Sequence, residues 1–178
     1  MKCYLLPLML STVLIACEST KVESDVVPNQ DNTSFSAERI HSNLSDGNLA
    51  LQGYDPVAYI NQQRVQKGSA TITAEFDNIK YQFATEDNRS AFESSPERFV
   101  PQYGGWCATG MAFDLVEDWN WAAGKYQVEP NTFRVTDGKL YLFYNFPDYN
   151  AKPDWLANEE EMIRRADQKW QDILDGKD

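Results

Sequence analysis

The stretch PQYGGWCA, Pro101–Ala108, carries the most information about how this chain folds. Two adjacent glycines, a tryptophan and a cysteine stand together in it, which is a costly composition for an ordinary turn. Glycine permits positive φ angles and close approach of backbone segments, and Cys107 supplies a soft ligand or a nucleophile. The stretch therefore predicts a turn with positive φ angles next to a lone thiol. The thiol would have either a structural or a chemical role.

The composition limits the classes of function. A chain of 178 residues has the length of one ordinary domain plus tails. Hydrophobic residues make up 42% and aromatic residues 13%, which is enough for a core. The net charge of −11 argues against a nucleic-acid partner, because binding to phosphates depends on Lys and Arg. An acidic surface also repels acidic substrates and is compatible with cations.

The first residues have the pattern of a targeting segment. An apolar run follows Lys2, and it is too short to span a bilayer but typical of a signal-peptide core. The run ends in LIAC, Leu14–Cys17, which resembles the bacterial lipobox, where a peptidase cuts before a cysteine that becomes lipidated. We expect residues 1–16 to be a lipoprotein signal peptide and Cys17 to anchor the chain in the bacterial cell envelope. Glu18 favours the outer membrane, facing the periplasm; the alternative is an ordinary signal peptide with a chance cysteine.

The cysteines and the linker follow from this expectation. Cys3 would leave with the signal peptide and Cys17 would be lipidated, so Cys107 would be the single thiol of the mature chain, without a disulfide partner. Residues 17–37 are polar and lack hydrophobic periodicity, which predicts a disordered tether. The folded domain is expected over residues 38–178.

Turn dipeptides and apolar alternation predict the strands. GYDPVAY, Gly53–Tyr59, is predicted as a turn that enters a short apolar strand, with Asp55 capping the turn and Pro56 fixing φ. Two pairs of apolar stretches flank turn dipeptides and predict β-hairpins. These are Ile72–Phe76 with Ile79–Phe83 around Asp77-Asn78, and Thr132–Val135 with Lys139–Tyr144 around Asp137-Gly138.

Capping residues and periodicity predict the helices. Thr85 is the expected N-cap of a helix to about Ser94, Pro96 begins a second short helix, and a helical segment resumes near Trp106. Asn158, with Glu161 three residues later, predicts the start of a final helix. One face of that helix is apolar, with Ile163, Ala166, Trp170 and Ile173. The fold class is therefore α+β: a small single domain with β-hairpins packed against short helices and a C-terminal amphipathic helix.

Five motifs occur in an order that resembles a known family. They are GYDPVAY, the first hairpin, NRSAFESSPERFVPQYGGWCA (Asn88–Ala108), DGKLYLFYN (Asp137–Asn145) and the terminal pattern of Ala166, Asp167 and Trp170. Together they resemble the secreted or lipoprotein branch of the YHS-domain family, over about Ile40 to Leu174. The resemblance implies a compact α+β domain, and because related domains accompany metal-transporting ATPases, it implies metal binding. The chain departs from the family pattern between Ala108 and Gln127.

One candidate site is a metal centre around the thiol. On a helix, Cys107 and Met111 are four residues apart and share a face. A thiolate with a thioether suits Cu(I) or another soft metal ion, and His41 could add an imidazole from the N-terminal side. The alternative is that Cys107 is a small buried hydrophobe beside Trp106, since a closed zinc site needs four ligands.

The second candidate site is a pocket for a small ligand. Tyr54, Asp55, Tyr103 and Trp106 would line a concave apolar site with a few polar groups if the fold brings them together. Ordinary packing of aromatic side chains, and a turn role for Asp55, are the alternatives.

These observations favour a membrane-tethered, non-catalytic binding module for a soft metal ion or a small ligand. One alternative is a structural lipoprotein that interacts with another envelope protein. The other is a thiol-dependent enzyme that uses Cys107, which would need a general base within hydrogen-bond reach.

Overall fold

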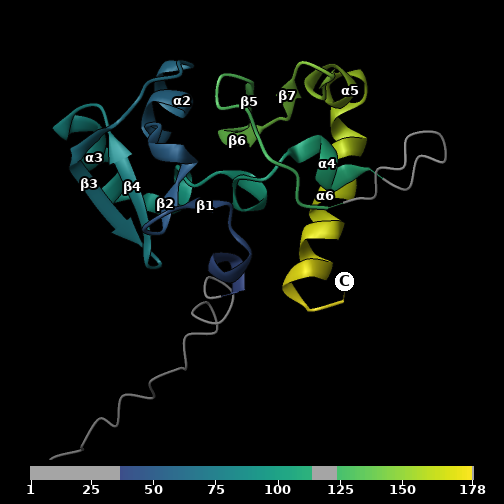
Figure 1. Cartoon of the computed structure of the whole chain (residues 1–178), viewed down its shortest axis with the longest axis horizontal. Helices are drawn as coiled ribbons and strands as arrows, with labels where there is room; N and C mark the ends of the chain where they lie inside the picture. The colour runs from purple at the N-terminus through teal and green to yellow at the C-terminus, as the bar shows by residue number, and fades with distance from the viewer. Residues whose placement is uncertain (1–36, 114–123, 178) are drawn as a thin grey trace, which may run out of the picture.

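The computed structural model of the chain describes residues 37–113 and 124–177. These residues form an α+β domain, as the sequence predicts (Figure 1). The expected signal peptide, the lipidation site Cys17 and nearly all of the tether lie outside the described residues. None of the helices in the described part has the length and apolar character needed to cross a lipid bilayer.

A four-stranded sheet forms the half of the domain drawn in blue and teal in Figure 1. Its strands are β1 (Leu44–Ser45), β2 (Leu49–Ala50), β3 (Ser69–Phe76) and β4 (Ile79–Phe83), in the order β1-β2-β4-β3. β3 and β4 pair antiparallel, and β2 lies parallel to β4. Asp77 and Asn78 have φ angles of 50° and 57°, the left-handed pair that a type I′ turn requires. The first predicted hairpin is confirmed.

The predicted strand in GYDPVAY is wrong, because this segment begins a helix. A 3-10 turn, η1 (Leu51–Gly53), leads into α2 (Pro56–Gln62). Asp55 is the N-cap of α2, and Pro56 occupies the first turn, where its missing N–H group costs no hydrogen bond. An Asp-Pro pair before an apolar run is a helix start as well as a turn signal, and here burial of the apolar residues on the sheet selects the helix.

The next two helical segments agree with the prediction. α3 (Glu86–Ser94) begins after Thr85, whose hydroxyl accepts a hydrogen bond from the Asn88 N–H, and η2 (Pro96–Arg98) follows. Phe92 of α3 is 1% exposed. Its ring centroid lies 4.7 Å from that of Tyr81 and 5.1 Å from that of Phe83. This aromatic cluster fixes α3 against β4.

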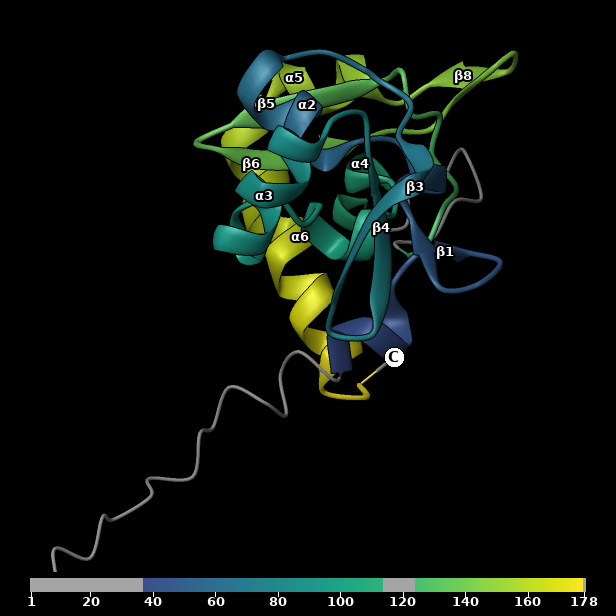
Figure 2. The ribbon, with the colours of Figure 1, turned by 90° about the vertical axis from the view of Figure 1, so that its left-hand side faces the viewer.

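The other half of the domain contains hairpins and the C-terminal helices. Its elements are η3 (Gln102–Gly105), α4 (Ala108–Ala112), β5 (Phe133–Thr136), β6 (Lys139–Leu142), β7 (Asn145–Phe146), β8 (Tyr149–Asn150), α5 (Lys152–Ala157) and α6 (Glu159–Leu174). The second predicted hairpin is confirmed, with Asp137 and Gly138 at φ angles of 53° and 74°. The β7–β8 hairpin projects from the body of the domain (Figure 2). Asn158 precedes α6 as predicted, but its side chain makes no capping hydrogen bond.

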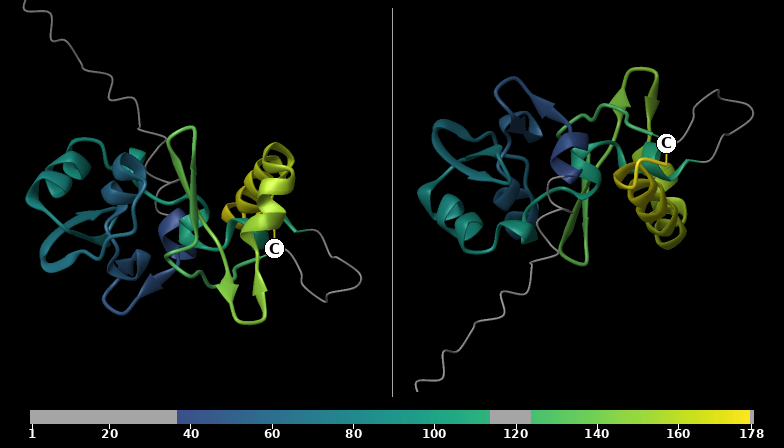
Figure 3. Two further views of the ribbon diagram at one scale, coloured as in Figure 1. Left: turned by 90° about the horizontal axis from the view of Figure 1, so that it is seen from above. Right: turned by 90° about the horizontal axis from the view of Figure 1, so that it is seen from below.

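β6 separates two hydrophobic clusters of the core. Leu140 and Leu142 pack in the first cluster, with the sheet, α2 and α3, whereas Tyr141 and Phe143 pack in the second cluster, with α4, α5 and α6. The two pairs point to opposite sides because the side chains of successive residues in extended backbone alternate, and Phe143 directly follows β6. All four side chains are buried. Figure 3 shows the green β5–β6 hairpin between the sheet half and the yellow helices. The apolar run after Asp137-Gly138 therefore joins the two halves.

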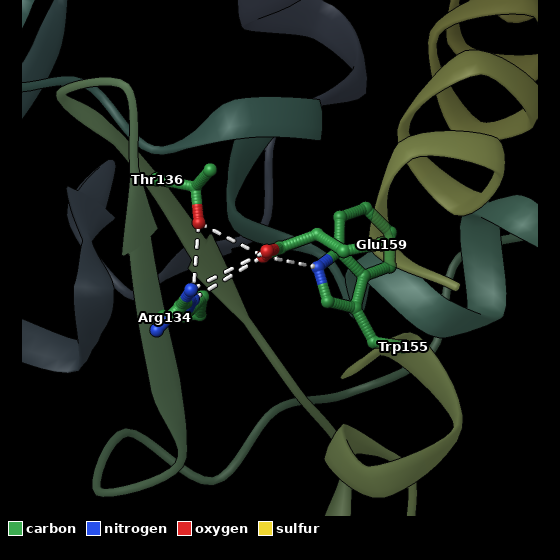
Figure 4. Close-up of polar contacts among 4 residues, drawn as sticks. All are labelled: Arg134, Thr136, Trp155 and Glu159. Atoms are coloured by element: carbon green, nitrogen blue, oxygen red, sulfur yellow. Dashed lines mark hydrogen bonds and ion pairs between the residues drawn. The ribbon is translucent and has the colours of Figure 1, made fainter. Parts of the chain in front are cut away.

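Glu159, the first residue of α6, ties the helix to the β5–β6 hairpin (Figure 4). Its carboxylate accepts hydrogen bonds from the Thr136 hydroxyl at 2.8 Å and the Trp155 Nε1 at 3.1 Å, and Arg134 Nε lies 3.3 Å away. Burial opposes the charged form, but these hydrogen bonds outweigh it and hold the pKa of Glu159 below its usual value. The stabilisation is therefore present above the ordinary pKa of glutamate and is lost as the pH falls through the lower pKa of the folded state.

Asp55 holds α2 against the start of α3. Its side chain is fully buried. One carboxylate oxygen accepts from the N–H groups of Val57 and Ala58 at 2.9 and 3.2 Å. The other accepts from the Ala84 N–H at 2.8 Å and the Asn88 Nδ2 at 2.7 Å. A buried carboxylate with four donors is satisfied by its surroundings, so Asp55 is a structural residue.

We expect Asp55→Asn to destabilise the domain strongly. Each carboxylate oxygen of Asp55 accepts from two donors. In asparagine one of these oxygens is replaced by an NH2 group, so the two donors that it faces would lose their acceptor. The expected loss is about 2–4 kcal/mol of the free energy of unfolding. Urea unfolding followed by circular dichroism measures it. Asp46, exposed in the turn between β1 and β2, is the matched control, and Asp46→Asn should change stability by less than about 0.5 kcal/mol. Equal effects of the two substitutions would contradict the structural role of Asp55.

Candidate functional site

The PQYGGWCA stretch pairs with β6 at both ends and loops out between them. Pro101 forms a parallel bridge with Leu140, and Cys107 forms one with Leu142. The stretch has more residues between these bridges than β6 has, so the intervening segment has to leave the strand. It does so through left-handed backbone: φ is 54° at Tyr103, 59° at Gly104 and 83° at Gly105. The predicted turn with positive φ angles is confirmed.

Tyr103 keeps this unfavourable backbone conformation because its side chain is fixed at both ends. The ring is buried, with centroids 6.0 Å from Tyr141 and 6.4 Å from Trp170. The hydroxyl donates to the Asp167 carboxylate at 2.9 Å. Burial, and then the charge of Asp167, raise the pKa of Tyr103, so the phenol remains a hydrogen-bond donor. The aromatic contacts and this hydrogen bond offset the cost of a left-handed tyrosine.

Residues 102–106, which leave the strand and are called the extruded loop below, hold residues 37–43 in place. The Asn43 N–H donates to the Gly104 carbonyl at 2.8 Å, and the Asn43 side chain donates to the Gly105 carbonyl at 3.2 Å. Trp106 Nε1 donates to the His41 carbonyl at 2.6 Å. In Figures 1 and 2, the short blue helix at residues 37–41 lies between the β3–β4 turn and the end of α6.

A cavity of about 350 Å³ lies between this segment, the sheet, the extruded loop and α6. Its wall combines aromatic and aliphatic side chains with five charged residues. The apolar side chains of the wall are Leu44, Ala50, Leu51, Phe76, Ile79, Tyr81, Val100, Pro101, Tyr103 and Trp170. The charged residues are Glu38, Arg39, Asp77, Lys139 and Asp167. Ser42, Gln102 and Gln171 add uncharged polar groups, so the wall is mixed rather than mainly apolar. Small-molecule sites also combine apolar side chains with polar groups, although their linings are usually more apolar than this one.

The charged groups of the cavity differ in how well the protein satisfies them. Burial raises the pKa of Glu38, and a hydrogen bond from Trp170 opposes that shift. The Asp167 carboxylate accepts from Tyr103. The Nε of Arg39 is buried and has no hydrogen-bond partner among the described residues. Arg39 also lines the cavity, so the wall holds a guanidinium whose Nε is unpartnered beside two carboxylates, Glu38 and Asp167, that have partners.

Of the four residues predicted to bind a ligand, only Tyr103 lines this cavity. Tyr54 packs against the first cluster, with the Lys67 ammonium 4.3 Å from its ring centroid. Asp55 is the buried helix cap described above. Trp106 packs against the second cluster, and its Nε1 donates a hydrogen bond to the backbone carbonyl of His41. The four residues do not converge, because β6 and its neighbours separate them.

The three predicted metal ligands belong to different surroundings. Cys107, 1% exposed, packs in the first cluster, and Met111 packs in the second. The His41 Nδ1 lies 2.7 Å from the Lys125 ammonium, an exposed contact. Within residues 37–113 and 124–177, no group of three or more His, Cys, Asp or Glu side chains is arranged to hold a metal ion.

Cys107 has a structural environment. It is the N-cap of α4, and its sulfur accepts from the Gly110 N–H at 3.4 Å and the Tyr144 N–H at 3.2 Å. Burial raises the pKa of the Cys107 thiol, and the backbone donors only partly oppose this. A reactive cysteine needs the reverse shift together with exposure.

Comparisons of the chain with family models, with curated proteins and with solved structures gave no match.

The cavity residues that sequence reasoning missed come from distant parts of the chain. Glu38 and Arg39 lie at the start of the domain, and Lys139 follows a turn. Asp167 and Trp170 stand out in the sequence only through the terminal motif and the apolar face of the last helix. Tyr103 and Asp167 are 64 positions apart, so only the folded structure shows that they meet.

We expect Gly104→Ala to cost more stability than Gly138→Ala. Both glycines have positive φ, 59° and 74°, so each substitution should lower the free energy of unfolding by about 1–2 kcal/mol, the cost of a left-handed alanine. A Cβ at Gly104 would lie 2.9 Å from the Ser42 Cα and 3.0 Å from the Trp170 ring, whereas a Cβ at Gly138 meets nothing within 4 Å. The contacts should add about 1–3 kcal/mol at Gly104. Urea unfolding of both variants measures the difference, and equal losses would contradict the close approach.

Proposed function

We propose that this chain is a non-catalytic binding protein and that its site is the cavity between residues 38–44, η3 and α6. The observation that carries the proposal is the cavity itself. Its volume of about 350 Å³ lies at the lower end of the range of about 300–1,000 Å³ that is typical of small-molecule sites. Its wall is built by a left-handed turn that costs energy, which is common where backbone geometry serves a site.

Binding of a small ligand is favoured over thiol chemistry and over a soft-metal site at Cys107. The sulfur of Cys107 is used as an acceptor by two backbone N–H groups, so it has little capacity left for a substrate or a copper ion. His41 contacts Lys125 rather than Cys107. The cavity instead offers rings, hydrogen-bond donors and carboxylates that can contact a small ligand.

We further propose that the domain belongs to the lipoprotein branch of the YHS-domain family and is tethered to the bacterial envelope. The five motifs in order support the family, and the lipobox-like LIAC at Leu14–Cys17 supports the anchor. A binding domain on such a tether would meet its ligand in the periplasm. The alternative is that the domain binds a protein partner in the envelope. That alternative predicts that the partner is co-purified with this chain even when the cavity is blocked.

The proposed site is tested by measuring the binding of small probes to the unmodified chain and to a variant whose cavity is blocked by a larger side chain. The probes are phenylacetate, phenylacetamide and phenethylamine, and the full chain is held in detergent micelles. Ligand-observed NMR should detect binding of at least one probe, with a Kd of about 1 mM or tighter for ligands of this size. Val100→Trp places an indole in the cavity and should abolish the signal.

Val65→Trp is the matched control for this experiment. Val65 is a half-buried valine that packs against the first cluster and does not line the cavity, so the same substitution there should leave binding unchanged. Absence of binding for all three probes to the unmodified chain, or binding that persists in Val100→Trp, would overturn the proposed site.

The anchor is tested separately, in a Gram-negative host. We expect the unmodified chain to incorporate labelled palmitate and to fractionate with the outer membrane. Cys17→Ser should lose the label and shift to the soluble or uncleaved fraction, because the acyl acceptor is gone. Cys3→Ser is the control, since Cys3 lies before the expected cleavage point. A Cys17→Ser chain that is still acylated would refute the anchor.

A further inference from the structure

Arg39 is the unusual residue of the cavity wall. In the part of the chain that the structure describes, its Nε is the one buried side-chain nitrogen or oxygen without a hydrogen-bond partner. A buried donor left unsatisfied is unfavourable, and more so when the group is charged. The guanidinium is a planar fork of donors that matches the two oxygens of a carboxylate. The Nε itself is closed off from the cavity, so a carboxylate there would pair with the two terminal nitrogens of the Arg39 guanidinium, which forms no ion pair with another described residue.

The carboxylates of the cavity do not meet this need. Asp167 accepts from Tyr103, and Glu38 is the partner of Trp170. Neither Arg39 nor Lys139 forms an ion pair with another described residue. Arg39 and Lys139 are therefore both available to pair with a negatively charged group in the cavity.

The rest of the wall combines apolar and aromatic side chains with the polar residues Ser42, Gln102 and Gln171. Trp170 and Tyr103 lie edge to face, 6.4 Å apart, and Val100, Ile79 and Leu44 add aliphatic surface. Such a wall stabilises a ring or a branched chain by burying it. Three carboxylates and two cations line the same cavity, so negative charge on a ligand beyond the one group that Arg39 pairs would be repelled.

We infer that the cavity binds a small organic acid, whose single carboxylate pairs with Arg39 while its aromatic or branched aliphatic body lies against Tyr103 and Trp170. This inference rests on the proposed function and names its ligand class. Lys139 is exposed and lines the same cavity, so it adds local positive charge in a chain that otherwise repels anions.

The test compares probes that share a phenyl body and differ in charge. Isothermal titration calorimetry on the full chain in detergent should give at least about tenfold tighter binding for phenylacetate than for phenylacetamide, because the amide lacks the charge-assisted pair. Phenethylamine and phenyl phosphate should bind more weakly than phenylacetate. Tighter binding of either one, or equal binding of the acid and the amide, would overturn the inference.

Arg39→Gln supplies the second arm of the test. It should weaken binding of phenylacetate at least about tenfold and leave binding of phenylacetamide nearly unchanged. Arg98→Gln is the matched control, since it removes the same charge from an exposed arginine outside the cavity and should change binding less than about twofold. Unchanged phenylacetate affinity in Arg39→Gln would overturn the role of Arg39.

Failure of this inference differs from failure of the proposed function. If phenylacetamide or phenethylamine binds the unmodified chain as well as phenylacetate does, and Val100→Trp abolishes that binding, the cavity is the site but the ligand class is wrong. If no probe binds the unmodified chain, both proposals fail. The comparison of acid and amide needs no substitution, so it decides the ligand class even if Arg39→Gln does not fold.

Discussion

The extrusion of residues 102–106 from the edge of β6 is the constraint on which the rest of the structure depends. Bridges at Pro101 and Cys107 fix the ends of the segment on the strand. The surplus backbone leaves the strand through left-handed residues, which the glycines allow and Tyr103 tolerates. The loop then presents the two carbonyls of Gly104 and Gly105 to Asn43. The N-terminal segment, and with it the cavity wall, is held by that loop.

The second constraint is that β6 is buried on both sides. A strand between two hydrophobic clusters cannot slip by one residue without moving Tyr141 and Phe143 into the space of Leu140 and Leu142. The register of the extruded loop is therefore fixed by the core. Glu159 adds to this, because its hydrogen bonds to Thr136 and Trp155 connect the hairpin to α6. α6 then supplies Asp167 and Trp170 to the cavity at a set position.

Local signals in the sequence predicted most of the elements, and long-range contacts explain what they missed. Asp77-Asn78 and Asp137-Gly138 determine their hairpins through the φ angles of two residues, so sequence reasoning finds them. Asp55 was identified as a cap, but whether a helix or a strand followed depended on the packing of α2. The cavity could not be predicted, because Arg39, Tyr103 and Asp167 meet only after the loop, the first segment and α6 are assembled.

The PQYGGWCA stretch divides into two parts with different roles. Its thiol is the chemically conspicuous group, yet Cys107 caps α4, accepts two backbone hydrogen bonds and belongs to the core. Pro101, Tyr103 and Gly104 line the cavity instead. The proposed site is therefore the cavity that the left-handed turn helps to line, and the sulfur lies outside it. A thiol in this position stabilises the fold, because its buried sulfur accepts hydrogen bonds from two backbone N–H groups that would otherwise lack this partner.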